Sequence, residues 1–477
     1  MTDFTSDWCI PIRAIIIVSV RHGVGVWFCD GGVMCSYSID RNGWLPRNRG
    51  SIIVLVFVML CGVLGILLVR PGTTADVWAH VYRVDAMLNG DVLARPVRAT
   101  SDYHHDAMRN MGGWVSGDVI AFSLVNDRDY VSGLVDPVSI TTCYGRRCEV
   151  PFNNTAVYPP FAYLPQLAAF AVGRLLRSST TIQFYLAEIL QLGVYFASVC
   201  ACLRLLSGNV LRWFRWLAGL LAVWMAMPFS FMFSPDSTLA ALSLPLACLM
   251  VRCVEGNRFS AKDCVVLVSI SGIITLAKFA YAPFLLMVLL PMAVYRRMDI
   301  RSRLILIGGC AISVLLLLAW VSVGTGFATN PSRVSYVEVV RRRQELLAAP
   351  QLFLLRMLYS VIRLQGWSWW EPPLLLLFWT LSIMALTLTV IAWRKNRRCL
   401  LFWLTAWVAA AGCVMLIYVA VWMQFTLDGQ QGVIGINSRY FLPLVPLLAM
   451  QCAAALQSIR QDIVNKPVTS VLRSPAP

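Results

Sequence analysis

Ten apolar segments, most of them close to the length needed to cross a membrane, constrain the fold of this chain. A membrane-spanning helix needs about 20 predominantly apolar residues. Hydrophobic residues make up 58% of the sequence and charged residues only 13%, whereas a soluble domain has roughly twice that charged fraction. The sequence therefore predicts an all-α polytopic membrane protein with about ten transmembrane helices. The expected segments are 52–69, 182–206, 213–233, 237–254, 263–277, 281–295, 304–324, 373–393, 399–422 and 439–458.

The distribution of Lys and Arg gives these segments an expected orientation. With the N-terminus in the cytoplasm, the regions assigned to the inside hold 22 Lys and Arg against 8 Asp and Glu. The regions assigned to the outside hold 18 against 16. Cytoplasmic loops of membrane proteins carry an excess of Lys and Arg. Topology therefore accounts for the net charge of +16, and the expected surroundings are membrane lipid, with no nucleic-acid partner.

This orientation predicts one membrane domain with two tails. Residues 1–50 are expected to be a cytoplasmic N-terminal tail, or sequence that precedes the true start. Residues 51–460 are expected to form the multi-spanning domain, and residues 461–477 a cytoplasmic C-terminal tail. The long loops 70–181 and 325–372 fall on the outer side, where they are expected to build a subdomain.

Three polar residues recur at helical spacing just after the first apolar segment. Asp76, His80 and Arg83 follow one another at intervals of four and three residues, which places a carboxylate, an imidazole and a guanidinium on one helix face. Thr73 or Thr74 is expected to cap this helix. The alternative is that Asp76 only stabilises the helix dipole and that His80 and Arg83 are solvated.

Three further ionisable residues fall at the outer ends of expected membrane helices, namely Asp236, Lys278 and Arg439. An ionisable group at membrane depth is costly and usually faces a cavity or a partner. Each of the three could instead cap a helix or reach the interface with its long side chain. Because Asp76 is expected on the same side of the membrane, a shared site is favoured over four separate roles.

Cys143 and Cys148 are the two cysteines that lie close together in a polar region. The intervening residues include Gly145, which permits a tight turn, and the outer side of a membrane permits oxidation. A disulfide is predicted here, and two free thiols are the alternative.

A second polar group lies at His104 and His105, which are flanked by Asp102 and Asp106. Carboxylate and imidazole together could hold a divalent metal. The spacing matches no closed metal motif, so solvated loop residues are the competing interpretation. The sequence identifies no cofactor and leaves a divalent metal open.

Four stretches of this sequence, at 75–81, 158–165, 234–236 and 438–443, carry the Asp76–His80 pair, a Tyr-Pro-Pro block, a Ser-Pro-Asp turn and a Ser-Arg-Tyr-Phe block. Together they resemble a bacterial membrane-protein family catalogued as domain of unknown function 2142. The segment Ala75–Val81 looks like the family's Pro-Asp-Glu-x-x-His-Phe signature, with Ala75 in place of the proline and Val77 in place of the second acid. A mechanism that needs paired carboxylates at this position is therefore not expected here. The resemblance runs over about residues 52–458, and its later blocks are Tyr-Pro-Pro-Phe-Ala-Tyr-Leu-Pro at 158–165, Ser-Pro-Asp at 234–236 and Ser-Arg-Tyr-Phe-Leu-Pro at 438–443.

That family in turn resembles the GT-C glycosyltransferases, which are multi-spanning enzymes with an acidic residue in the first outer loop. The resemblance implies a GT-C-like fold in the bacterial cytoplasmic membrane. It also implies transfer of a sugar from a polyprenyl-phosphate donor to a cell-envelope glycan or protein at the outer face. In this interpretation the catalytic residues are Asp76, His80 and Asp236, and the substrate- or phosphate-binding residues are Lys278, Arg439 and Arg83.

Two other functions remain open from the sequence. A transporter or flippase of a lipid-linked or polar solute would need charged groups near the membrane midplane, or broken helices in two matching halves. A non-catalytic membrane subunit of a polysaccharide assembly would need neither.

Overall fold

The computed structural model describes most of the chain. The described residues are 15–20, 23–30, 33–39, 49–74, 76–99, 110–126, 143–207, 211–256, 259–323, 334, 336–364, 371–392, 397–427 and 429–465. The histidine pair at 104 and 105 and its flanking aspartates lie outside these residues. The proposed metal group around them therefore stays a prediction.

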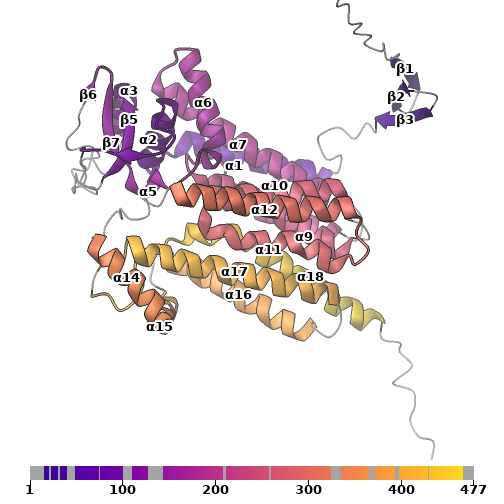
Figure 1. Ribbon diagram of the computed structural model, residues 1–477. Coiled ribbons are helices and arrows are strands. Elements are labelled where there is room, and N and C mark those ends of the chain that lie inside the picture. Colours follow the sequence, from indigo (N-terminus) through magenta and orange to yellow (C-terminus); the bar gives the residue numbers. More distant parts are fainter. Residues whose placement is uncertain are drawn as a thin grey trace, which may run out of the picture. The chain divides into compact units, whose positions relative to one another are not determined.

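Each of the ten expected segments contains a helix, and most of these helices run side by side (Figure 1). Helix α9 is central, since it packs against α7, α8, α10 and α18. This confirms the all-α polytopic membrane fold. The helices are α1 (Arg49–Leu68), α7 (Thr180–Leu205), α8 (Arg212–Phe229), α9 (Pro235–Glu255), α10 (Ala261–Ala277), η2 (Phe279–Leu285) with α11 (Leu286–Val294), α12 (Ile300–Val323), α16 (Glu371–Ala392), α17 (Arg397–Gln424) and α18 (Val445–Asn465).

Within the described residues, seven helices are long and apolar enough to cross a membrane, and an eighth span is possible if one bent pair is counted. The bent pair is α14 (Tyr336–Ala348) with α15 (Pro350–Ile362). Helices α8, α10 and α11 are shorter or less apolar than the other expected spans. The count of ten crossings therefore stays a prediction.

A small subdomain lies at one end of the bundle (Figure 1). The sequence predicts loops here, but the structure adds a four-stranded antiparallel sheet of order β4-β5-β7-β6. Its strands are β4 (Arg95–Pro96), β5 (Met111–Ser116), β6 (Cys143–Tyr144) and β7 (Arg147–Pro151). The helices beside it are α2 (Val77–Leu88), α3 (Gly117–Asn126) and α5 (Asn153–Ala156), followed by η1 (Pro160–Tyr163) and α6 (Leu164–Leu175).

The hairpin of β6 and β7 brings the two paired cysteines together. Cys143 lies directly opposite Cys148, and Gly145 adopts a positive φ of 62° in the turn between them. The two sulfur atoms lie 2.10 Å apart, as in a disulfide. The turn therefore supplies the geometry that the spacing of these residues suggests.

The N-terminal region is a separate compact unit that covers Met1–Ile52. It contains three antiparallel strands of order β1-β2-β3, and its assignment as a cytoplasmic tail stays a prediction. The strands are β1 (Ile15–Val20), β2 (Gly23–Asp30) and β3 (Val33–Ile39).

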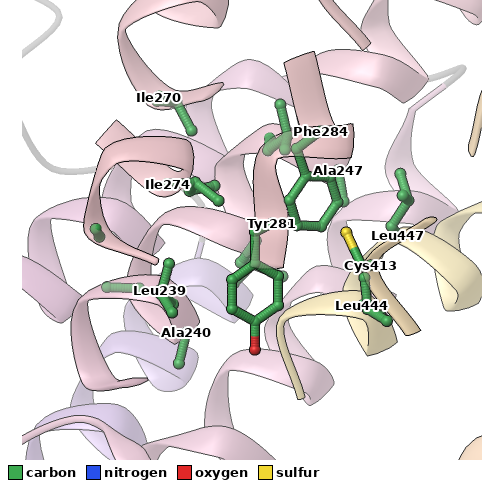
Figure 2. Close-up of a cluster of buried hydrophobic side chains, with 14 of the residues drawn as sticks. Leu239, Ala240, Ala247, Ile270, Ile274, Tyr281, Phe284, Cys413, Leu444 and Leu447 are labelled. Carbon is green, nitrogen blue, oxygen red and sulfur yellow. The ribbon is translucent and has the colours of Figure 1, made fainter. Parts of the chain in front are cut away.

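The apolar core of the membrane domain extends up to the segment that follows α10. Figure 2 shows Tyr281 and Phe284 of η2 among side chains of α9, α10 and α17. Both rings are fully buried. The Tyr281 hydroxyl donates a hydrogen bond of 2.7 Å to the carbonyl of Tyr440, which ties this core to the segment just before the last helix.

Candidate functional site

A cavity at the subdomain end of the bundle collects five of the residues that the sequence singles out. It is lined by Asp76, His80, Asp236, Lys278 and Arg439, among others. Asp76 directly precedes α2 and His80 lies in its first turn, and the other three come from the start of α9, the end of α10 and the segment before α18. The structure thus places in one cavity residues up to 363 positions apart.

Charges of opposite sign alternate along the wall of this cavity. Arg439 Nη2 donates to Asp76 Oδ2 at 2.6 Å, and Arg439 Nε lies 3.4 Å from Asp236 Oδ2. Lys278 Nζ donates to the other oxygen of Asp236 at 2.8 Å. The order of the chain of ion pairs is therefore Asp76, Arg439, Asp236, Lys278, with two carboxylates balanced by two cations.

Asp76 occupies an unusual backbone position. It has φ 61° and ψ 11° and stands immediately before α2, which begins at Val77. The expectation of a threonine cap with Asp76 in the first turn is therefore wrong, and the Asp76 side chain makes no cap hydrogen bond. A left-handed conformation costs a non-glycine residue on the order of 1 kcal/mol or more and is typical of functional sites. The conformation turns the carboxylate into the cavity, where Asn154 Nδ2 donates to Oδ1 at 3.1 Å.

The other three ionisable residues stand where helices begin or end. Asp236 follows Pro235 in the first turn of α9, and its N–H donates to Ser234 Oγ at 3.1 Å. Lys278 has an extended backbone (φ −153°, ψ 111°) where α10 stops. The Arg439 N–H donates to Asn437 Oδ1 at 3.0 Å in the short helix η3 (Ser438–Tyr440). Each charge is therefore held by local chain geometry as well as by its ion pairs.

Aromatic rings surround the ammonium group of Lys278. Its Nζ lies 4.6 Å from the ring centre of Tyr440 and 5.7 Å from that of Tyr158. A ring face attracts a cation, more strongly where water is excluded. The sequence marks Tyr440 only as a neighbour of Arg439, and the roles of Tyr158 and Asn154 at the site were not predicted.

A second group of residues that line the cavity is largely apolar. Ile417, Ala420, Val421 and Gln424 of α17 line it at helical spacing, together with Phe425. Helix α17 is one of the helices long and apolar enough to span a membrane. The cavity therefore joins an ionic wall to a wall built by a membrane helix, an arrangement that suits an amphipathic ligand.

Two titratable groups at the start of α2 have shifted pKa values. Burial against the cavity wall raises the pKa of Asp76, but the charge of Arg439 and the hydrogen bond it donates outweigh this and hold the pKa below its ordinary value. Burial lowers the pKa of His80 to about 4, although Asp76 acts in the opposite direction. At neutral pH the site therefore contains an ionised Asp76 and a neutral His80, whose Nδ1 lies 2.7 Å from the Tyr163 hydroxyl.

We expect His80 to make folding stability depend on pH. An unfolded histidine titrates near pH 6.5, so between pH 6.5 and about 4 the unfolded chain binds a proton that the folded chain does not. Stability therefore falls as the pH falls through this window, by up to ~3 kcal/mol. Thermal unfolding of the purified protein at pH 7.5 and 5.0 measures this, and His80→Gln should shrink the difference. An equal pH dependence in wild type and variant would contradict it.

Arg83 does not belong to the site, in contrast to the sequence prediction. It is fully buried, and its guanidinium donates to the carbonyls of Asp91, Val92 and Tyr158 at 3.1, 2.8 and 3.2 Å. These bonds fasten the end of α2 to two surrounding segments. Both terminal nitrogens of Arg83 bind backbone carbonyls inside the protein, and Arg83 is not among the residues that line the cavity, which indicates a structural role.

A resident metal has no ready ligand set among the described residues. They contain no group of three or more His, Cys, Asp or Glu side chains that could hold one. The two carboxylates of the cavity are instead engaged by Arg439 and Lys278.

The fold and the cavity define an integral membrane protein of many helices with an ionic site at one end of its bundle. The chain belongs to the family described as "Predicted membrane protein (DUF2142)", whose profile matches residues 141–448. The matched part contains Asp236, Lys278 and Arg439, whereas Asp76 and His80 precede it. No curated protein and no solved structure matches the chain.

Proposed function

We propose that this protein is a GT-C-like glycosyltransferase that moves a sugar from a polyprenyl-phosphate donor to a cell-envelope glycan or protein. The observation that carries the proposal is the cavity, whose lining combines two carboxylates and two cations with apolar residues of α17. A lipid-linked sugar phosphate has an apolar chain, an anionic phosphate and a polar sugar. The two kinds of wall offer a complementary surface to the first two of these parts.

The proposed reaction joins the acceptor to the sugar and releases the lipid phosphate. The acceptor hydroxyl loses its proton to a carboxylate, and its oxygen forms a bond to the anomeric carbon. The bond from that carbon to the phosphate oxygen breaks, and the electron pair stays with the phosphate. General-base catalysis contributes roughly 100- to 10,000-fold to such a rate, and cations stabilise the charge that develops on the leaving group.

Asp76 suits the role of base better than Asp236 does. The Asp76 side chain is 39% exposed, against 6% for Asp236. Asp236 is also held by both cations, whereas Asp76 contacts only Arg439 of the two. An acceptor entering from the solvent side therefore reaches Asp76 first, and Asp236 is left to orient Lys278 and Arg439.

Donor binding would also make Asp76 a stronger base. In the empty cavity Arg439 lowers the pKa of Asp76, and a weak base accepts a proton poorly. A phosphate that takes over the Arg439 guanidinium would weaken this ion pair and raise the pKa of Asp76. Proton acceptance would then be coupled to the presence of the donor.

We place the cavity on the outer side of the bacterial cytoplasmic membrane, with both termini in the cytoplasm. Helix α12 supports opposite locations for its two ends. Near its C-terminal end the Trp320 indole donates to the carbonyl of Val157, which lines the cavity. Its 24 residues extend about 36 Å at 1.5 Å per residue, which is enough to cross the apolar layer. Residues near Ile300 should therefore face the cytoplasm.

Cysteine labelling tests this orientation. Asp118 lies in the subdomain and Arg301 at the far end of α12, and both are exposed. We expect Asp118→Cys to react with a membrane-impermeant maleimide in intact cells, and Arg301→Cys to react only after permeabilisation. Labelling of the wild-type chain measures the signal that comes from its native cysteines. The opposite pattern would place the cavity in the cytoplasm and would remove the proposed donor side.

A transfer assay tests the activity directly. The purified protein is incubated with polyprenyl-phosphate sugars that carry a radiolabel in the sugar, and with cell-envelope fractions as acceptors. Transfer of label from the lipid phase to the acceptor is the expected result. If the label moves across a vesicle bilayer without leaving the lipid, the protein is not a transferase.

That second outcome corresponds to a lipid flippase, and one feature of the structure favours it. Lys278 and Asp236 are largely buried ionisable residues of the membrane domain, and such residues can mark a substrate or ion pathway. The transfer assay and a vesicle flipping assay on the same preparation separate the two functions.

A further inference from the structure

Helices α14 and α15 meet at a sharp angle close to the segment that carries Arg439. They are bent by 105° at Ala349 and Pro350. Pro350 opens α15, and the residue before a proline is pushed away from the helical conformation, as the φ of −144° at Ala349 shows. Neither helix contributes a residue to the lining of the cavity. Side chains of both helices nevertheless make polar contacts with the part of the chain that connects α17 to Arg439.

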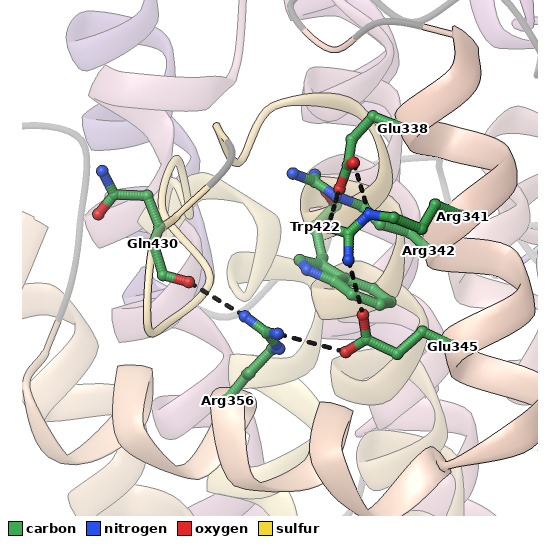
Figure 3. Close-up of polar contacts among 7 residues, drawn as sticks. All are labelled: Glu338, Arg341, Arg342, Glu345, Arg356, Trp422 and Gln430. Carbon is green, nitrogen blue, oxygen red and sulfur yellow. Dashed lines mark hydrogen bonds and ion pairs between the residues drawn. The ribbon is translucent and has the colours of Figure 1, made fainter.

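A buried arginine of α14, paired with a glutamate of the same helix, connects α14 to the end of α17 (Figure 3). Arg342 and Glu338 are 2% and 6% exposed, and Arg342 Nε donates to Glu338 Oε1 at 2.6 Å. Arg342 Nη1 also donates to the carbonyl of Trp422, in the last turn of α17. The final carbonyls of a helix lack partners within it and attract cations. Helix α14 is therefore held at the end of α17, where an irregular segment from Phe425 to Asn437 begins.

Helix α15 holds the irregular segment itself through two side chains. Arg356 Nη1 donates to the carbonyl of Gln430 at 3.1 Å, while Nη2 donates to Glu345 Oε1 at 3.3 Å (Figure 3). One turn further along α15, Ser360 Oγ accepts a hydrogen bond of 2.5 Å from the Val433 N–H. Two backbone groups of a segment without regular structure are thus fastened to α15.

The segment needs such contacts because its own backbone is permissive. It contains Gly429 and Gly435 with φ values of 77° and 99°, a conformation that glycine adopts freely. Thr426 Oγ1 closes the segment by donating to the carbonyl of Ile434 and accepting from its N–H, both at 3.1 Å. Arg439 follows only five residues after Ile434. The position of its guanidinium therefore depends on where this segment is held.

We propose that the bent pair of α14 and α15 is a positioning element for Arg439, and that Arg356 and Ser360 are its positioning residues. They act on a ligand only through the segment from Phe425 to Asn437. The proposal takes Arg439 as the phosphate-binding residue and in that respect rests on the proposed function. A misplacement of about 1 Å at a binding group can cost up to about 100-fold, so loss of one of these contacts is expected to weaken phosphate binding by about 10-fold.

The test compares Arg356→Gln with Arg363→Gln in the full chain. Both variants remove one positive charge, from Arg356 in the middle of α15 or from Arg363 directly after it. Arg363 is exposed, and its guanidinium lies over the Tyr359 ring. Binding of dodecyl phosphate, with dodecanol as the uncharged reference, is measured by tryptophan fluorescence in a neutral detergent. We expect about 10-fold weaker binding in Arg356→Gln and Ser360→Ala, and wild-type binding in Arg363→Gln.

A double-variant cycle separates positioning from general loss of structure. If Arg356 acts through Arg439, its removal should have little further effect on binding in an Arg439→Lys background. Additive effects of the two changes would overturn the proposal, as would wild-type binding in both Arg356→Gln and Ser360→Ala.

Hydrogen exchange keeps the proposal testable if the phosphate site itself lies elsewhere. Peptides covering residues 425–440 should exchange faster in Arg356→Gln than in Arg363→Gln, with no change in α9 and α10. Failure of the wild type to bind dodecyl phosphate, together with this faster exchange, would count against the proposed function and leave the positioning element supported. Unchanged exchange in that segment would overturn the positioning element.

Discussion

Asp76→Asn is expected to abolish most of the transfer activity while leaving the protein folded and inserted. Removal of a general base costs roughly 100- to 10,000-fold in rate. The structural cost should be small, because the asparagine has the same shape and the ion pair that it breaks is partly exposed, at 39% for Asp76. Exposed ion pairs contribute about 0 to 1 kcal/mol. Arg439 keeps Asp236 as a second partner, so the change leaves no isolated buried charge.

The measurement is initial transfer rate per amount of inserted protein, with Asp118→Asn as the matched control. Asp118 is an exposed acid in the first turn of α3, in the same subdomain, and its loss should leave the rate unchanged. A normally inserted Asp76→Asn protein with the wild-type rate would remove Asp76 from the mechanism. The Asp236 carboxylate would then be the next candidate.

The membrane helices could be predicted because most of them are long apolar runs. In a bilayer such a run has few structures other than a helix that satisfy its backbone hydrogen bonds. The sheet could not be predicted in this way. Its strand β5 contains Gly112 and Gly113, which weaken the alternating apolar pattern of a strand. Gly112 is needed for packing, because a Cβ there would lie 1.9 Å from the carbonyl oxygen of Val150 on the neighbouring strand. A close approach of two neighbouring strands at a glycine adds no periodic pattern of apolar residues to the sequence.

The sequence predicts most of the residues that line the site. It does not predict which of them form ion pairs with each other, or that Arg83 lies outside the site. Charged residues at membrane-helix ends are costly to bury unless they contact a partner or a cavity. For this reason Asp236, Lys278 and Arg439, all on one side of the membrane, were grouped correctly. Arg83 was grouped wrongly because helical spacing does not say where a long side chain ends. Its guanidinium lies against the carbonyls of Asp91, Val92 and Tyr158, whereas Asp76 and His80 line the cavity.

Arg439→Lys is expected to weaken donor binding about 10- to 100-fold, even though the charge is kept. Hydrogen bonds to charged groups contribute about 1.5–3 kcal/mol each. Arg439 donates a hydrogen bond to Asp76 through Nη2, and its Nε forms an ion pair of 3.4 Å with Asp236. A planar guanidinium can present two parallel donors to a phosphate. A lysine ammonium is a single point charge and cannot reproduce this geometry. If Arg439 only reached the interface with its charge, lysine would serve equally well.

Lys278 needs a different design, because it is paired with a buried carboxylate. Lys278→Met leaves Asp236 with Arg439 at 3.4 Å as its remaining ion pair, and breaking a buried pair can cost 3–5 kcal/mol. The double variant Lys278→Met with Asp236→Asn removes both charges and avoids this penalty. We expect it to insert and to bind a polyprenyl-phosphate sugar at least 10-fold more weakly than wild type. Binding as tight as wild type in both this variant and Arg439→Lys would place the phosphate site elsewhere. The glycosyltransferase proposal would then depend on Asp76 alone.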